Sequence, residues 1–207
     1  MPTSYPASFD ALTNPASADP LTSPSHASQH ANANDAIEAI QVRAGRTGTA
    51  FPATPATGAR FLRTDSNIEY YYDGTRWLSA GLLSLSMGAA NAVSTTGDEY
   101  LRVANSHALG LGMYIVSISI AAYVSTTNDA SNYWSFRMTS QDANTFTQIG
   151  STVNTSATAA GTWASYSLSS IGHVGTTANE AYTLRIAKTG APGTVSATAV
   201  VYYRLIG

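Results

Sequence analysis

The amino-acid sequence predicts a mainly β protein whose C-terminal part, residues 81–207, is an antiparallel β-sandwich of the jelly-roll type. Apolar and polar residues alternate repeatedly along this part, as they do in half-buried strands. Loops rich in glycine, asparagine, threonine and serine join the segments, and no repeat of fixed length appears. The preceding residues differ from this part in composition. Seven of the eight prolines precede Ala56, and residues 1–81 hold twelve of the 22 charged residues. We therefore expect a boundary near Ala80 and Gly81.

The first segment, residues 1–22, contains four prolines among serine, threonine, alanine and aspartate. Proline fixes φ and removes N–H donors, so we expect an extended arm without a core of its own. The same composition also fits a disordered tail. An arm that lies on the surface of a neighbouring molecule would anchor there through its large apolar side chains, which are Tyr5, Phe9, Leu12 and Leu21.

One helix is predicted, over residues 23–45. Ser23 is a good N-cap, Pro24 suits the first helical position, and Gly45 suits the left-handed residue that ends a helix. Spacings of four, three, four, three and four define a heptad-like seam, made of His26, His30, Ala33, Ile37, Ile40 and Ala44. This seam predicts an oligomerising helix. The alternative is one amphipathic helix packed on its own domain, because the pattern is short.

His26 and His30 are four residues apart, the spacing at which one helix offers two imidazoles to a metal ion. No third ligand stands nearby in the sequence, and polar residues at seam positions commonly set the register of an oligomer. We therefore expect both histidines to pack in the seam, and we expect no metal and no cofactor. His107 and His173 lie in loop-like segments and are expected at the surface.

After the helix we expect a turn-rich linker over residues 46–58 and a small meander over residues 59–80. Asp73 and Gly74 lie between two aromatic runs, which is a strong hairpin signal. So small a meander buries little surface alone and should pack on the helix or on another copy. The expected strands are residues 59–64, 68–72 and 75–79.

Two aromatic residues of the meander are candidates for binding. Tyr71 must face away from Tyr70 and Tyr72, because side chains alternate along a strand. We expect Tyr71 and Trp77 either to stack on a sugar ring of a glycan or to form a subunit contact. The low charge of the chain favours the subunit contact, since tyrosine and tryptophan are enriched at interfaces.

The body, residues 81–207, contains eight segments that fit strands. Eight strands in about 125 residues suit a two-sheet jelly roll, although alternation alone does not determine the topology. The expected strands are residues 82–87, 99–104, 114–121, 133–138, 145–149, 163–169, 182–186 and 195–205.

Composition excludes several classes of function. Charged residues make up 11% of the chain, the net charge is −2, and no basic run is present, so we expect no nucleic-acid partner. There is no cysteine and none of the familiar nucleophile, phosphate-binding, zinc or dinucleotide motifs, so we expect no enzyme. The start lacks signal-peptide features, and no apolar stretch spans a bilayer, so we expect synthesis in a cytoplasm and no membrane partner.

Two stretches of the chain resemble a known class of proteins. "YPASFDALTNPASADPLTSPSHASQHANANDAIEAIQVRAG" resembles the N-terminal segment of structural proteins of tailed bacteriophages, such as tail fibres, head fibres and capsid decoration proteins. "FPATPATGARFLRTDSNIEYYYDGTRWLS" resembles a small β module that accompanies this segment. The two stretches cover residues 5–79. The resemblance implies a homotrimer that is attached to the virion by its N-terminal part, with Ile37 and Ile40 as the trimer contacts and residues 1–22 as the anchoring arm.

The resemblance leaves the place on the virion open. The chain lacks the long repetitive shaft of many fibres, which favours a capsid decoration (cement) protein or short head fibre on the outer capsid surface. Its partners would be its own copies and the major capsid protein or another virion protein. The alternative is a tail or head fibre whose β body recognises a glycan on the host surface.

Overall fold

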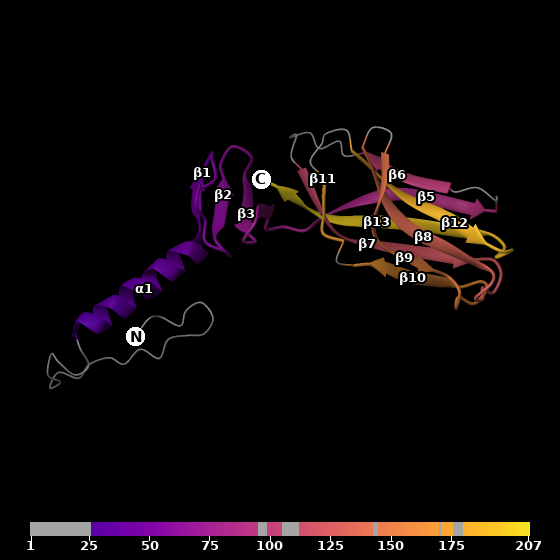
Figure 1. The fold of residues 1–207 in the computed structure, drawn as a ribbon, viewed down its shortest axis with the longest axis horizontal. Coiled ribbons are helices and arrows are strands. Elements are labelled where there is room, and N and C mark those ends of the chain that lie inside the picture. Colours follow the sequence, from indigo (N-terminus) through magenta and orange to yellow (C-terminus); the bar gives the residue numbers. More distant parts are fainter. Residues whose placement is uncertain (1–25, 95–98, 105–111, 143–144, 170, 176–179) are drawn as a thin grey trace. The chain divides into compact units, whose positions relative to one another are not determined.

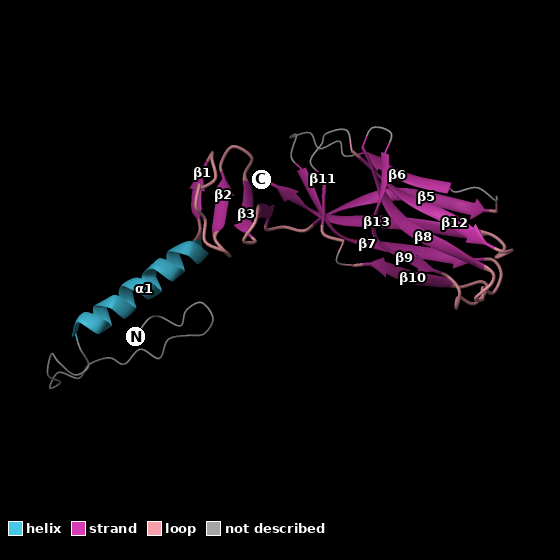
Figure 2. Ribbon diagram, in the orientation of Figure 1, coloured by secondary structure: helices cyan, strands magenta, loops and turns pink. Residues whose placement is uncertain are grey.

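The structure, a computed structural model, describes residues 26–94, 99–104, 112–142, 145–169, 171–175 and 180–207. The chain forms two compact units, Met1–Ala80 and Gly81–Gly207, which divide where the composition changes. In the part that is described, the first unit combines one helix with a small sheet, and the second unit consists of strands and loops (Figures 1 and 2). No described helix has the length and apolar character needed to cross a membrane.

Helix α1 spans His26–Ala44 and ends as the sequence predicts. Gly45 has a φ of 85°, in the left-handed region that favours glycine, and its N–H donates to the carbonyl of Gln41 at 3.2 Å. A Cβ at Gly45 would also lie only 3.0 Å from Cβ of Arg60. The predicted cap, Ser23 and Pro24, lies outside the described residues.

The sheet of the first unit has four strands, one more than predicted. The three antiparallel strands agree with the expected meander, while β1 lies in the segment expected to be a linker and pairs in parallel with β2. The expected linker is therefore wrong for residues 46–48, while residues 49–58 contain no helix or strand. A three-residue strand without alternation has no local signal, because its pairing depends on residues fifteen positions away. The strands are β1 Arg46–Gly48, β2 Arg60–Arg63, β3 Ile68–Tyr72 and β4 Trp77–Ser79.

Aromatic rings form the core of this small sheet, and Phe51 is at their centre. Its ring stacks on Trp77 with centroids 5.0 Å apart, meets Tyr70 edge-on at 5.1 Å, and lies 5.4 Å from Phe61. The guanidinium of Arg63 lies over the same ring at 5.0 Å, a cation–π contact. Phe51 belongs to the expected linker, so that segment completes the core of the unit.

The body contains nine strands in two antiparallel sheets. One sheet has the order β5–β13–β7–β10, with β11 also paired to β7, and the other has the order β6–β12–β8–β9 (Figure 1). The strands are β5 Leu83–Val93, β6 Glu99–Ala104, β7 Gly112–Val124, β8 Tyr133–Asp142, β9 Thr145–Asn154, β10 Trp163–Leu168, β11 His173–Gly175, β12 Ala181–Thr189 and β13 Val195–Ile206.

This strand order confirms the jelly roll. Along the chain β5 lies in the first sheet, β6 in the second, β7 in the first, β8 and β9 in the second, β10 in the first, β12 in the second and β13 in the first. Successive strands thus change sheets at every step except β8 to β9, which is the winding of an eight-stranded jelly roll with two Greek keys. All eight predicted body strands are present, and β11 is an additional short strand that alternation does not reveal.

The core of the body lies between the two sheets. The largest side chains that are completely buried include Trp134 and Phe136 on β8 and Tyr182 on β12. Strict alternation along β7 would place Val116 on the same face as Ile118, but Ile118 is buried and Val116 is only half-buried. The pairing of β7 with β13 shifts register here, and this bulge puts Ile115 on the same buried face as Ile118.

Candidate functional site

The predicted seam lies on one face of α1 and is open to solvent in a single chain. With 3.6 residues per turn, its six positions fall within about 80° of the helix circumference. Ile37 is 51% exposed and Ile40 is 53% exposed, and His30, Ala33 and Ala44 are exposed as well. His26 is the first residue of the helix. A stripe with two isoleucines half in water is the surface that a second copy of the helix would cover.

Two other predictions concern the N-terminal part. The anchoring residues Tyr5, Phe9, Leu12 and Leu21 lie outside the described residues. Within the part of the chain that the structure describes, no three histidine, cysteine, aspartate or glutamate residues gather in a way that could hold a metal ion.

Trp77 is placed differently from the expected binding residue. Its side chain is 6% exposed, with Phe51 stacked on it at an interplanar angle of 15° and Tyr72 at 5.4 Å. Phe51 and Tyr72 cover most of the ring, so little of its face is open for a sugar to stack on, which disfavours the glycan alternative for Trp77. Tyr71 is half-buried and alternates with the buried Tyr70, so it points to the other side of β3 as predicted.

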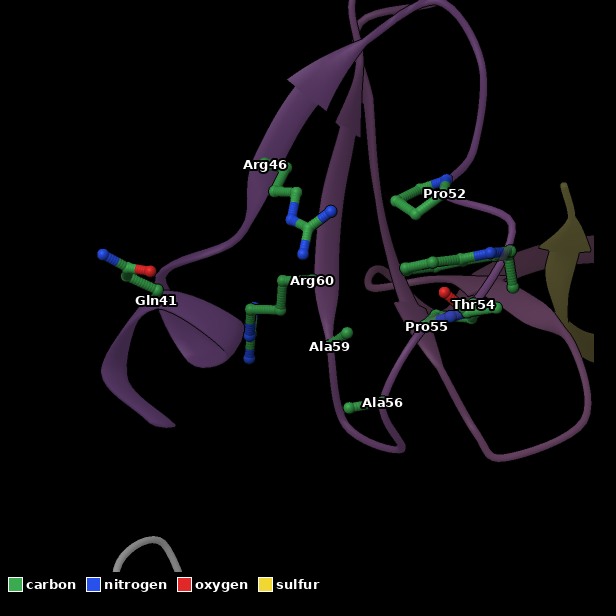
Figure 3. Close-up of a pocket in the computed structure, with 9 residues that line it drawn as sticks. Gln41, Arg46, Pro52, Thr54, Pro55, Ala56, Ala59 and Arg60 are labelled. Atoms are coloured by element: carbon green, nitrogen blue, oxygen red, sulfur yellow. The ribbon is translucent and has the colours of Figure 1, made fainter. Parts of the chain in front are cut away.

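A hollow of about 440 Å³ of empty volume, partly open to solvent, lies at the junction of α1 and the small sheet (Figure 3). Arg46 of β1 and Arg60 of β2 line one side, and Pro52 and Pro55 line another. Trp77 also lines the hollow. Arg60 is also paired with Glu69 at 2.9 Å. No carboxylate or imidazole of the described residues lines the hollow. The remaining lining residues are Gln41, Thr54, Ala56 and Ala59.

Sequence reasoning missed a buried polar contact in the body. His173, expected at the surface, donates from Nε2 to Glu180 Oε1 at 2.7 Å, and the side chain of Glu180 is only 8% exposed. The ring of Tyr182 packs edge-on against His173 at 6.0 Å. A Cβ added to Gly175 would lie 1.7 Å from the Tyr182 hydroxyl and 2.7 Å from Glu180 Oε2. Glu180 is thus packed closely beside Gly175 and Tyr182, while the side chain of His173 stays 23% exposed.

The buried tyrosine predicts a loss of stability in alkali. Burial, followed by the neighbouring Glu180 carboxylate, raises the pKa of Tyr182 above its ordinary value of about 10. The unfolded chain releases this proton near pH 10 while the folded chain retains it, so stability is complete below pH 10 and falls above it. Thermal unfolding between pH 8 and 11.5 should show a steeper fall for the natural protein than for Tyr182→Phe. Equal slopes would contradict this assignment.

Three loops at one end of the sandwich are joined by hydrogen bonds, and we call residues 125–132, 155–162 and 190–194 the three-loop tip. The Ala160 N–H donates to Thr127 Oγ1 at 3.2 Å, and Thr126 Oγ1 donates to the Pro192 carbonyl at 2.6 Å. Each bond joins two different loops. Such cross-links order the backbone of all three loops before any ligand arrives.

Asn128 is the buried centre of the three-loop tip, with 3% of its surface exposed. Its amide nitrogen donates to the carbonyls of Thr126 and Pro192, and its amide oxygen accepts from Thr155 Oγ1 at 2.5 Å. Thr155 Oγ1 accepts in turn from the backbone N–H of Trp134 at 2.9 Å. This buried amide makes the three-loop tip rigid. Any movement that broke one of its hydrogen bonds would leave a buried polar group unpaired, which costs free energy.

An exposed aromatic pair lies beside the three-loop tip, and sequence reasoning did not single it out. Trp163 begins β10 directly after the tip and is 61% exposed. Its cross-strand neighbour on β7 is Tyr123, whose ring centroid lies 5.8 Å away at a tilt of 50°. Ala122 and Val124 are fully buried, so Tyr123 projects from the outer face of the sheet.

Comparison with solved structures shows a weak likeness to a viral protein. No family model matches the chain, and no curated protein matches its sequence. A solved structure of infectious bursal disease virus, strain Gx, is similar at a TM-score of 0.34 with 10% sequence identity. The match covers 64% of this chain and 35% of the viral chain.

Proposed function

We propose that the protein is a structural component of a bacteriophage virion. In this proposal it is a capsid decoration protein that binds the outer capsid surface as a trimer, through its N-terminal region. The observation that carries the proposal is the exposed seam of α1, where Ile37 and Ile40 are each about half in water. The phage-like stretches over residues 5–79 add support, because they place this seam in a segment that resembles virion proteins.

The proposed mechanism is stabilisation by binding. Each copy would cover surface on neighbouring capsid subunits, and a ligand that binds only the assembled shell stabilises that shell by mass action. The seam would hold three copies together, so that three weak attachments act at once and the whole trimer leaves slowly. At the hollow near α1, Arg46 would supply a cationic contact for acidic groups on such a partner, since Arg60 is already paired with Glu69.

Deleting residues 1–22 tests the attachment. We expect the truncated protein to lose its binding to capsids while the body melts at the same temperature as in the complete chain, because the arm lies in the other unit. Binding is measured by co-sedimentation with particles that lack the protein, with the complete chain as control. Full occupancy by the truncated protein would contradict an anchoring role for the arm.

A second candidate function is a receptor-binding fibre. The exposed Trp163 beside the three-loop tip favours this second function, because shell binding through the N-terminal region does not account for an exposed tryptophan on the body. The number of copies per virion separates the two candidates. Hundreds of copies correspond to decoration, and about a dozen correspond to a tail component.

A further inference from the structure

Trp163 is the most exposed of the large hydrophobic side chains among the described residues. The other exposed aromatic on the sandwich is Phe146, on β9, at 51%. Burying a tryptophan ring stabilises a fold strongly, and this ring is left in solvent beside ordered loops. Such a placement indicates a contact for a ligand. We propose that Trp163, supported by Tyr123, forms a site for an uncharged sugar ring.

The geometry of the pair suits a pyranose ring. An aromatic face carries negative charge density and attracts the weakly positive C–H groups that line one face of a sugar. Tyr123 lies against Trp163 at a tilt of 50° and limits the rotation of the indole. Ser196 is the neighbour of Tyr123 on β13, and Ser165 follows Trp163 on the same face of β10, so hydroxyl groups border the aromatic pair.

The backbone that presents Trp163 is fixed before binding. The Gly161 N–H donates to the Val124 carbonyl at 3.0 Å, which ties the end of the loop to β7. Thr162 Oγ1 donates to the Ala159 carbonyl at 2.7 Å and closes the turn immediately before Trp163. A contact that needs no ordering on binding retains more of its interaction energy, which matters for ligands as weakly held as single sugars.

The charges near the pair select a neutral ligand. Asp129 is the one charged residue in the sequence of the three-loop tip, and β10 has none. Its carboxylate accepts from the N–H groups of Ser131 and Asn132 at 2.7 and 2.8 Å and from the Asn132 amide at 3.2 Å. These donors, Ser131 first, lower the pKa of Asp129 and engage its oxygens locally. Sialic or uronic acids would find no cation here, whereas neutral hexoses need none.

The test is saturation-transfer NMR and calorimetry on the complete chain with neutral and anionic oligosaccharides. The neutral probes are maltohexaose, cellohexaose, mannan and galactan fragments, and the anionic probes are sialyllactose and oligogalacturonate. We expect binding of at least one neutral probe, with a loss of tenfold or more in Trp163→Ala and partial recovery in Trp163→Tyr. Phe146→Ala is the control, because it removes another exposed aromatic side chain from the same sandwich, and it should bind as the natural protein does.

Four results would overturn the sugar site. Three concern binding: no neutral probe binds at millimolar concentration, Trp163→Ala binds as well as the natural protein, or the anionic probes bind better than the neutral ones. The fourth is a change of oligomeric mass in Trp163→Ala, which would make Trp163 a subunit contact. The site is independent of capsid attachment through the N-terminal region. Loss of capsid binding on removal of residues 1–22 with no sugar binding would leave the proposed function intact and sink this inference alone.

Discussion

Replacing Ile37 and Ile40 together with aspartate should leave the protein as a monomer of 21.6 kDa, one third of the mass of the proposed trimer. Both side chains are about half exposed in a single chain, so three helices that meet along the seam would bury the exposed halves of six isoleucines. That burial contributes roughly 5–9 kcal/mol to association, at about 1.5–3 kcal/mol for a fully buried isoleucine. The aspartates remove this term and add repulsion between like charges.

The measurement is light scattering coupled to size-exclusion chromatography at a few micromolar protein. Ala27→Asp combined with Ala31→Asp is the matched control, because both alanines are exposed on α1 and lie away from the seam. The control should keep the mass of the natural protein. A natural protein that is monomeric, or a seam variant that keeps its mass, would show that α1 does not hold the copies together.

Local patterns in the sequence correctly predicted the helix end, the hairpin turn and the strands, because these features depend on a few consecutive residues. Gly45 ends α1 with a positive φ, and Gly74 turns between β3 and β4 with a φ of 101°, as their positions between periodic segments predict. All eight body strands follow from alternation, because the inner side chains of a sandwich repeat every second residue. The choice of a jelly roll followed from the number of strands and agrees with the observed order.

Features that depend on contacts between distant segments could not be predicted from local sequence patterns. The parallel pairing of Arg46 with Phe61, and the place of Phe51 against Trp77, depend on segments that meet only after folding. The bulge in β7 is a register shift against β13, which alternation within β7 does not record. The contact of His173 with Glu180 is likewise a product of the fold.

The two candidate surfaces differ in how far the sequence predicted them. The seam of α1 was visible because heptad spacing is a local property of a helix, whereas the exposed aromatic of the body was not. Trp77 and Trp163 occur in similar contexts, "GTRWLS" and "GTWAS", each near the start of a strand. One is 6% exposed and the other 61%, so packing by other segments alone decides which ring faces solvent.

This contrast gives the second large prediction: Trp77→Ala should unfold the small sheet, while Trp163→Ala should leave stability unchanged. Removing a buried tryptophan costs about 3–5 kcal/mol, which is comparable to the whole stability of so small a unit. The loss is enlarged because Phe51 stacks on Trp77 and would lose its own contact. An exposed side chain without such a role changes stability by about 0.5 kcal/mol or less.

Hydrogen exchange on the complete chain resolves the two units separately. In Trp77→Ala we expect fast exchange of the amides of β2, β3 and β4, with β7 and β13 as protected as in the natural protein, because the body has its own core between two sheets. In Trp163→Ala both regions should keep their protection. Unchanged protection of β2–β4 in Trp77→Ala would show that the aromatic core does not hold the small sheet together. A role for Trp77 in a subunit contact would then need to be tested.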